Sequence, residues 1–151
     1  MKNKYINLSL VIVFFLIAFF LINNPSQNLN LENIKEVRIA GESIKVDLAI
    51  TKEMHEKGLS GRSTLENDEG MLFVFDKPGK YYFWMKGMNF PIDIIWFDEN
   101  MKVVYIKKDA RKENFLETYG PNINTKYVLE VVSNFSDKNN LKIGDEILFT
   151  Y

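Results

Sequence analysis

The sequence predicts a mainly β fold, a compact sandwich or jelly-roll-like barrel with one or two short helices, preceded by an N-terminal transmembrane helix. Three observations predict this class. Short apolar stretches with period-two alternation recur after residue 35 and are separated by turn residues, as in all-β sandwiches and barrels. Strong helical periodicity is absent after residue 60. An uncharged, mostly apolar run occupies residues 6–22.

The apolar run 6–22 predicts a signal anchor. As a helix rising about 1.5 Å per residue it would span about 25 Å, close to a bilayer core of about 30 Å. Lys2 and Lys4 precede the run, and no other cation follows until Lys35. The positive-inside rule then leaves the N-terminus in the cytoplasm and places the rest of the chain outside the membrane.

A cleaved signal peptide is the competing interpretation of this segment, and it would make the protein secreted. Such peptides end in a small-x-small cleavage site, which the run lacks, because Ala18 is followed by large apolar residues. We therefore expect an uncleaved anchor over residues 1–22, a polar linker over 23–33 and a β domain over 34–151.

Composition excludes several classes of function. The 151 residues fit one domain with a terminal extension, and 19 basic against 20 acidic residues give a net charge of −1. Without a basic field, nucleic acid is not an expected partner. The chain has no cysteine and one histidine, His55, and it shows neither a metal-ligand motif nor a phosphate-binding glycine loop. We expect no metal and no cofactor.

The hydrophobic pattern places the strands. We expect strands over residues 36–40, 43–50, 71–75, 81–85, 92–97, 102–107, 127–133 and 146–151. A Pro-Gly turn at 77–80 would pair the strand 81–85 back on the strand 71–75. The run 108–125 reads as an irregular loop, and 135–141 as a helical turn.

One short helix is expected over residues 52–57. Thr51 is a suitable N-cap, and Gly58 suits the left-handed stop that follows a helix. Met54 and Leu59 would face the core.

Five groups of residues, in chain order, carry a resemblance to a known family. They are Thr51-x-Glu53 with Gly58-Leu59-x-x-Arg62, Gly70-Met71-Leu72-Phe73-x-Phe75, Phe83-Trp84-Met85-Lys86, Pro91-Ile92-Asp93-Ile94-Ile95 and Tyr127-Val128-Leu129-Glu130. Together they resemble the domain of unknown function 192 family, also called uncharacterised protein family 0127. The resemblance covers most of residues 35–151. It implies a compact, mostly β, jelly-roll-like domain, often behind a signal or anchor segment, and it implies no established activity.

Two acidic residues interrupt apolar strands and are the first candidates for a binding site. Asp93 and Glu130 each lie between large apolar neighbours, where an unpaired carboxylate is costly to bury. Arg62 and Lys86 are the cations that could pair with them. One interpretation is a small polar pocket formed by Arg62, Asp93 and Glu130 beside Trp84. The other is a structural ion pair that fixes a loop on the sheet.

The aromatic segment 81–85 supplies a second candidate surface. With a period of two, Tyr82 and Trp84 share one face of the strand, while Tyr81 and Phe83 share the other. One face is expected to be core, and the other to be covered or to bind a sugar or a peptide. His55 is expected at the surface.

Three hypotheses of function follow. The first is a membrane-anchored extracytoplasmic binding or interaction module with a protein or glycan partner in the cell envelope. The second is a hydrolase-like enzyme acting on envelope polysaccharide or a small ligand, with Asp93 and Glu130 as acid and base and Arg62 as an anion binder. The third is a purely structural accessory domain, which would have no pocket.

Overall fold

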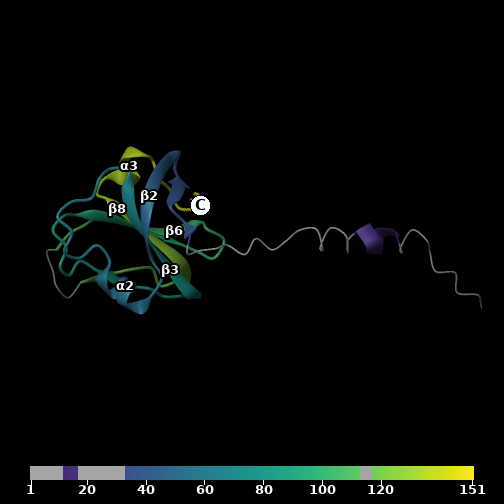
Figure 1. Ribbon diagram of the computed structural model, residues 1–151, viewed down its shortest axis with the longest axis horizontal. Coiled ribbons are helices and arrows are strands. Elements are labelled where there is room, and N and C mark those ends of the chain that lie inside the picture. The colour runs from purple at the N-terminus through teal and green to yellow at the C-terminus, as the bar shows by residue number, and fades with distance from the viewer. Residues whose placement is uncertain (1–11, 17–32, 113–116) are drawn as a thin grey trace, which may run out of the picture. The chain divides into compact units, whose positions relative to one another are not determined.

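The computed structural model describes residues 12–16, 33–112 and 117–151 (Figure 1). The chain divides into two units, Met1–Asn30 and Leu31–Tyr151. Residues 12–16 of the first unit are helical. The rest of the expected anchor, and the linker up to residue 32, lie outside the described residues. In the part of the chain that is described, no helix has the length and apolar character needed to cross a membrane.

The second unit is built mainly of strands, with two short helices among its described residues. The strands are β1 (Glu36–Ile39), β2 (Glu42–Ala49), β3 (Glu69–Gly79), β4 (Phe83–Trp84), β5 (Ile92–Phe97), β6 (Val103–Ala110), β7 (Thr118–Tyr119), β8 (Thr125–Val132) and β9 (Leu148–Thr150). The helices are α2 (Lys52–Lys57) and α3 (Phe135–Lys138). Figure 1 shows the two helices at opposite ends of the domain.

The larger sheet has seven strands in the order β6-β5-β8-β3-β2-β1-β9. β2 and β3 pair in parallel, and the other pairs within this sheet are antiparallel. A parallel pair cannot be joined by a hairpin, so the chain crosses from β2 to β3 through α2 and the segment that follows it. A second sheet contains β4 and β7.

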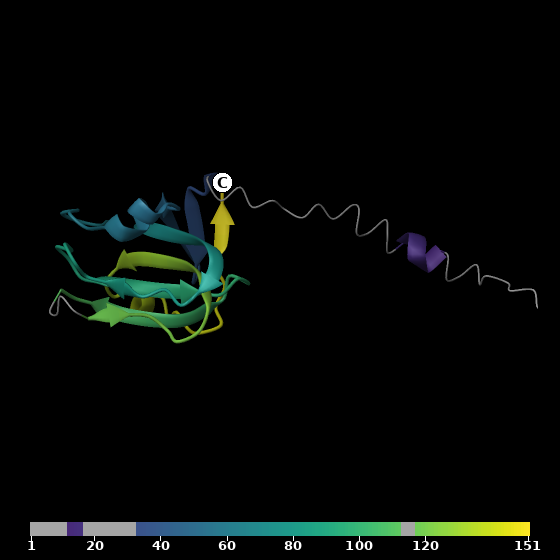
Figure 2. The same ribbon diagram turned by 90° about the horizontal axis from the view of Figure 1, so that it is seen from below.

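The seven-stranded sheet curls into a half-barrel (Figure 2). Val37 of β1 and Val103 of β6 come from opposite sides of the sheet, yet both belong to one buried apolar cluster. The C-terminal segment extends from one edge strand to the other. Val103 N–H donates to Asp145 O at 2.8 Å and Ile147 N–H to Met101 O at 3.0 Å, and β9 then pairs with β1. The first cluster therefore fills the inside of the curl.

The other face of the sheet carries a second apolar cluster. Alternation along β3 sends Leu72 and Val74 into the first cluster, and Met71 and Phe73 into the second. The segments that follow β2 and β3 cover this face and contribute Leu59, Leu65, Met85 and Met88 to the cluster. These coverings, and not a second large sheet, give the domain its outer layer.

The mainly β prediction with few short helices is confirmed, in the form of a curled half-barrel, and most predicted strands are present. The predicted pairing of 81–85 with 71–75 is wrong, because β2 and β8 occupy both sides of β3, and β4 pairs with β7 instead. The predicted turn at 77–80 is also wrong, since β3 continues to Gly79.

Two smaller expectations also need correction. Met54 was expected in the core, but it is 46% exposed, whereas Leu59 is buried as expected. The run 108–125 is not irregular throughout, because β6 continues to Ala110 and β7 lies within the run.

Candidate functional site

A pocket opens on the second face of the sheet, between α2 and the aromatic segment 81–84. Its volume is about 200 Å³. β3 and β8 supply its base, α2 and the turn after it supply one wall, and the aromatic segment supplies the other. The residues lining it are Lys52, His55, Glu56, Lys57, Gly58, Leu59, Ser60, Phe73, Phe75, Tyr81, Tyr82, Phe83, Trp84, Met88 and Glu130.

Glu130 is the acidic group at the base of the pocket. It pairs with Met71 across β3 and β8 and follows Val128 on the same face, which places it on the second apolar cluster. The residue is 4% exposed, and its Oε2 atom is buried with no hydrogen-bond partner among the described residues. Burial raises the pKa of this carboxyl to about 8, while the positive charge of Arg62 acts in the opposite direction.

α2 forms one wall of the pocket, and residues at both of its ends define where the helix begins and stops. The side chain of Thr51 accepts the Met54 N–H at 3.3 Å, which caps the first turn. Gly58 ends the helix with φ +49°, a conformation that suits glycine. A Cβ atom at Gly58 would lie 3.7 Å from Oε2 of Glu130. The glycine that terminates α2 therefore lies directly beside the carboxyl group.

His55 ties α2 to the sheet. Its Nε2 atom lies 2.9 Å from Ala49 O and 3.2 Å from Val74 O. Both partners are carbonyl oxygens, so Nε2 carries the proton and donates. The ring is half-buried, 4.5 Å between centroids from Phe75. The prediction of a surface histidine is therefore wrong, because the ring joins the helix to the end of β2 and to the middle of β3.

Stacked aromatic rings form the opposite wall. Phe75 and Tyr81 stack with centroids 3.5 Å apart and planes at 7°, and Tyr81 Oη donates to Lys77 O at 2.6 Å. Phe83 meets Phe73 edge-on at 4.8 Å. Trp96 Nε1 donates to Tyr81 O at 2.9 Å, which holds the segment on the sheet. These contacts hold the wall against the sheet.

Tyr82 and Trp84 form the outer rim of the pocket. They are 52% and 49% exposed, whereas Met85 is 3% exposed and Phe83 is half-buried. The face that carries Phe83 and Met85 is therefore the core face, and the other face is open to solvent. Large aromatic surfaces at the mouth of a pocket are typical of binding sites.

Arg62 and Lys86 lie at the edge of this region. Arg62 forms an ion pair with Asp47, and its carbonyl accepts Asn89 Nδ2 at 2.7 Å. The Lys86 carbonyl accepts Ser60 Oγ at 2.7 Å. These contacts fasten the turn after α2 to the segment 86–89. Arg62 lines a neighbouring, more open cavity and not the aromatic pocket.

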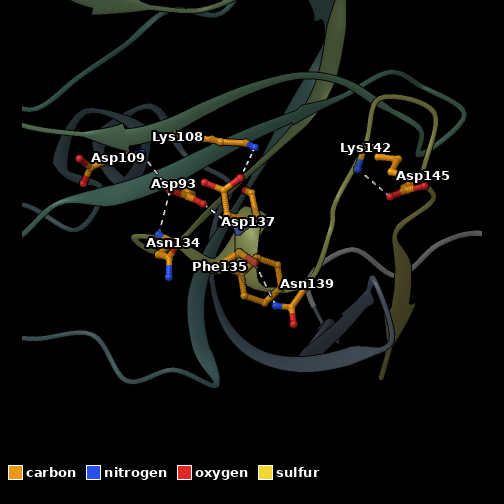
Figure 3. A network of polar contacts seen from close by, with 10 residues as sticks. Asp93, Lys108, Asp109, Asn134, Phe135, Asp137, Asn139, Lys142 and Asp145 are labelled. Atoms are coloured by element: carbon orange, nitrogen blue, oxygen red, sulfur yellow. Dashed lines mark hydrogen bonds and ion pairs between the residues drawn. The ribbon is translucent and has the colours of Figure 1, made fainter.

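Asp93 lies on the other face of the sheet and has a different environment (Figure 3). Its carboxylate accepts three backbone N–H groups, from Asp109 at 2.9 Å, Asn134 at 3.2 Å and Ser136 at 2.8 Å. Asn134 and Ser136 begin α3, whose own N-cap side chain makes no capping bond. Asp93 is fully buried and supplies that cap, joining β5, β6 and α3.

The structure thus brings Glu130 and Trp84 to one pocket and leaves Asp93 apart from them. Asp93 pairs with Val131 and Ile94 pairs with Glu130, so the two acids project from adjacent strands to opposite faces. Asp93 and Glu130 therefore do not face one substrate together, as the enzyme hypothesis requires. No cluster of three metal-ligating side chains occurs among the residues described.

Sequence reasoning missed the inner wall of the pocket. His55, Phe75 and Tyr81 gave no signal, because an aromatic or histidine residue in a strand or short helix reads as core or surface. Tyr81 and Trp84 lie on opposite faces of a strand pattern, yet both line the pocket, since β4 contains only Phe83 and Trp84, and Tyr81 lies outside the strand.

Comparison with known proteins agrees with this geometry and with the sequence motifs. Residues 35–149 match the family model DUF192, described as Uncharacterized ACR. The chain belongs to this family. No curated protein matches this DUF192 chain.

Two solved structures share the fold of this DUF192 domain. One is a protein of unknown function from Novosphingobium aromaticivorans, with 28% identity and a TM-score of 0.72, covering 76% of this chain and 84% of that one. The other, from Sinorhizobium meliloti, is provisionally described as a transcription regulator. It has 24% identity and a TM-score of 0.71, covering 76% of this chain and 92% of that one. At that identity the second likeness concerns the fold alone.

Proposed function

We propose that this DUF192 protein is a binding module that holds a small ligand, or one side chain of a partner, in the aromatic pocket above Glu130. The observation that carries the proposal is an aromatic pocket with an acidic group, buried and unpaired at Oε2, at its base. Buried polar groups are usually hydrogen-bonded, and leaving one unpaired costs about 1–3 kcal/mol. A ligand that supplies the missing partner recovers that free energy.

The geometry favours binding over the two alternatives. Acid–base hydrolysis needs two carboxyl groups about 5–10 Å apart that face the same bond, whereas Asp93 and Glu130 project to opposite faces of the sheet. A purely structural domain would have no reason to keep Tyr82 and Trp84 about half exposed around a cavity.

The pocket can be tested by fragment screening on the full chain in lipid nanodiscs. A library of small aromatic and aliphatic fragments would be screened by amide chemical-shift changes. We expect binders to shift resonances of α2 and residues 81–84, and their Kd to rise at least fivefold in Trp84→Ala. Tyr151→Ala is a matched control, because Tyr151 is 56% exposed and does not line the pocket. A library in which no fragment perturbs this region would overturn the proposal.

We also propose that the apolar run 6–22 anchors this module in the cell membrane, with the β domain on the extracytoplasmic side. Its support is the uncharged run and the lysines that precede it. In bacterial cells, we expect the full-length chain to resist carbonate extraction from membranes and to be digested by protease added to spheroplasts. A shorter chain in the medium would indicate cleavage. Full-length protein in the cytosol would contradict both the membrane anchor and the extracytoplasmic position of the β domain.

A further inference from the structure

Three polar side-chain atoms at the walls of the pocket are already bonded within the protein. His55 Nε2 donates to two carbonyls, Ser60 Oγ donates to Lys86 O, and Tyr81 Oη donates to Lys77 O. Oε2 of Glu130 is the buried lining atom without a partner among the described residues. The base of the pocket therefore offers a buried acceptor close to aromatic rings.

This combination selects a particular ligand chemistry. A sugar carries many hydroxyl groups and needs several donors and acceptors, which the inner walls do not have free. A single buried carboxyl with aromatic faces around it fits a cation, because aromatic rings attract positive charge and a carboxylate completes the ion pair. We propose that the pocket binds an organic ammonium cation, a protonated amine on a small apolar body, whose N–H group donates to Oε2 of Glu130.

No neighbouring cation of the described chain already fills this role. Arg62 is the cation that acts on Glu130, but its guanidinium is paired with Asp47. Lys52 at the rim pairs with Glu56 at 3.8 Å, and the two side chains are 83% and 62% exposed, where water screens their charges. Besides Glu130, the ionisable side chains that line the pocket are Lys52, His55, Glu56, Lys57, Tyr81 and Tyr82.

The size of the pocket limits the ligand. About 200 Å³ is comparable with the cavity of about 150 Å³ that holds one benzene molecule in another protein. That suits a small free amine or the aminoalkyl end of a lysine side chain on a partner. Both sources present the same group, an ammonium on an apolar stem, and the probes below separate them.

The number of protons released on binding is a second measurable consequence of the proposal. Because burial raises the pKa of Glu130 to about 8, the empty pocket at pH 7 holds mainly the neutral acid. An ammonium ligand favours the carboxylate, so the carboxyl proton leaves to solvent as the cation enters. Binding of a neutral ligand releases no such proton. The proposal rests on the proposed binding function and specifies the class of ligand for that same pocket.

The test compares two probes of nearly equal shape, benzylamine and benzyl alcohol, on the full chain in nanodiscs at pH 7. Isothermal titration calorimetry would give Kd, and repeating it in buffers of different ionisation enthalpy would count released protons. We expect benzylamine to bind at least tenfold more tightly than benzyl alcohol and to release close to one proton. N-acetyl-lysine methylamide, tested alongside, distinguishes a free amine from a lysine side chain.

Glu130→Gln is the decisive variant, because the amide keeps the shape and removes the charge. We expect it to lose the preference for the amine, so that benzylamine binds no more tightly than benzyl alcohol. Trp84→Leu keeps apolar area without the ring, and we expect it to weaken benzylamine binding about two- to fivefold. Equal affinities for amine and alcohol, or a preference that survives in Glu130→Gln, overturn the cation assignment and leave the pocket intact as a binding site. If neither probe nor any fragment binds, both the cation assignment and the proposed binding function fail.

Discussion

At the scale of single residues, Glu130 makes a prediction about stability that needs no ligand. In the unfolded chain a glutamate titrates near 4.3, whereas burial raises the folded-state pKa to about 8. Between these values the folded state holds one more proton than the unfolded state. Stability is therefore highest below the unfolded pKa and falls as pH rises toward about 8.

Glu130→Gln removes this titration. We expect the free energy of unfolding of the wild type, relative to the variant, to fall by about 1.4 kcal/mol per pH unit between pH 5 and pH 7.5. Urea denaturation of both proteins across that range measures the slope, and all other titrating groups cancel in the difference. A difference that does not change with pH would mean that Glu130 is ionised in the folded protein.

Asp93 and Glu130 show how far residue types can be interpreted from sequence. Both are acids within apolar strands, and the sequence correctly marked both as needing an explanation. Their neighbours along the chain do not reveal the partners, because the N–H groups that Asp93 accepts come from residues 16 to 43 positions away. Glu130 has no such partner at Oε2. The pairing of β5 with β8 places the two side chains on opposite faces of the sheet, where Asp93 caps α3 and Glu130 lies at the pocket.

At the scale of elements, the base of the pocket depends on how closely β3 approaches β8. Gly70 in β3 lies opposite Val131, and a Cβ at Gly70 would be 2.7 Å from the backbone oxygen of Glu130. Such an overlap with backbone can be relieved only by separating the strands. We expect Gly70→Ala to destabilise the domain by about 1–3 kcal/mol, the usual range for overpacking.

Gly79→Ala is the matched control for this substitution. It lies in the same strand, but its nearest contacts are ring atoms of Tyr81 at about 3.1 Å, and a side chain can move where a backbone oxygen cannot. Denaturant unfolding of both variants measures the comparison. Equal destabilisation would show that the close approach of β3 and β8 is not what requires a glycine at position 70.

The elements were predictable to different degrees for physical reasons. β5 and β8 were predicted within about two residues, since their long apolar runs need burial on both faces. α2 was predicted with its cap and its stop because Thr51 and Gly58 act locally. A strand containing β4 was predicted, but its partner was not, because the pairing of β4 with β7 depends on residues more than 30 positions away and on both sides of β3 being occupied.

At the scale of the whole molecule, the curl of the sheet depends on the C-terminal segment that joins its two edges. Ile147 is fully buried in the cluster inside the curl, and its N–H donates to Met101 O at 3.0 Å. The residues before and after it lie at opposite edges of the sheet, because Asp145 O accepts the N–H of Val103 in β6, and β9 pairs with β1. This side chain therefore packs where the two edges of the half-barrel come together.

We expect Ile147→Ala to lower the free energy of unfolding by about 2–5 kcal/mol, since the cavity forms where the surrounding strands cannot easily close on it. Ile143→Ala is the matched control, because Ile143 is 62% exposed four residues earlier in the same segment and should change stability by less than about 0.5 kcal/mol. Urea unfolding of both variants, followed by tryptophan fluorescence, measures the difference. If Ile147→Ala costs no more than the control, the curl is maintained by the strands β1 to β8 alone, and the C-terminal segment is a covering with no part in closing the sheet.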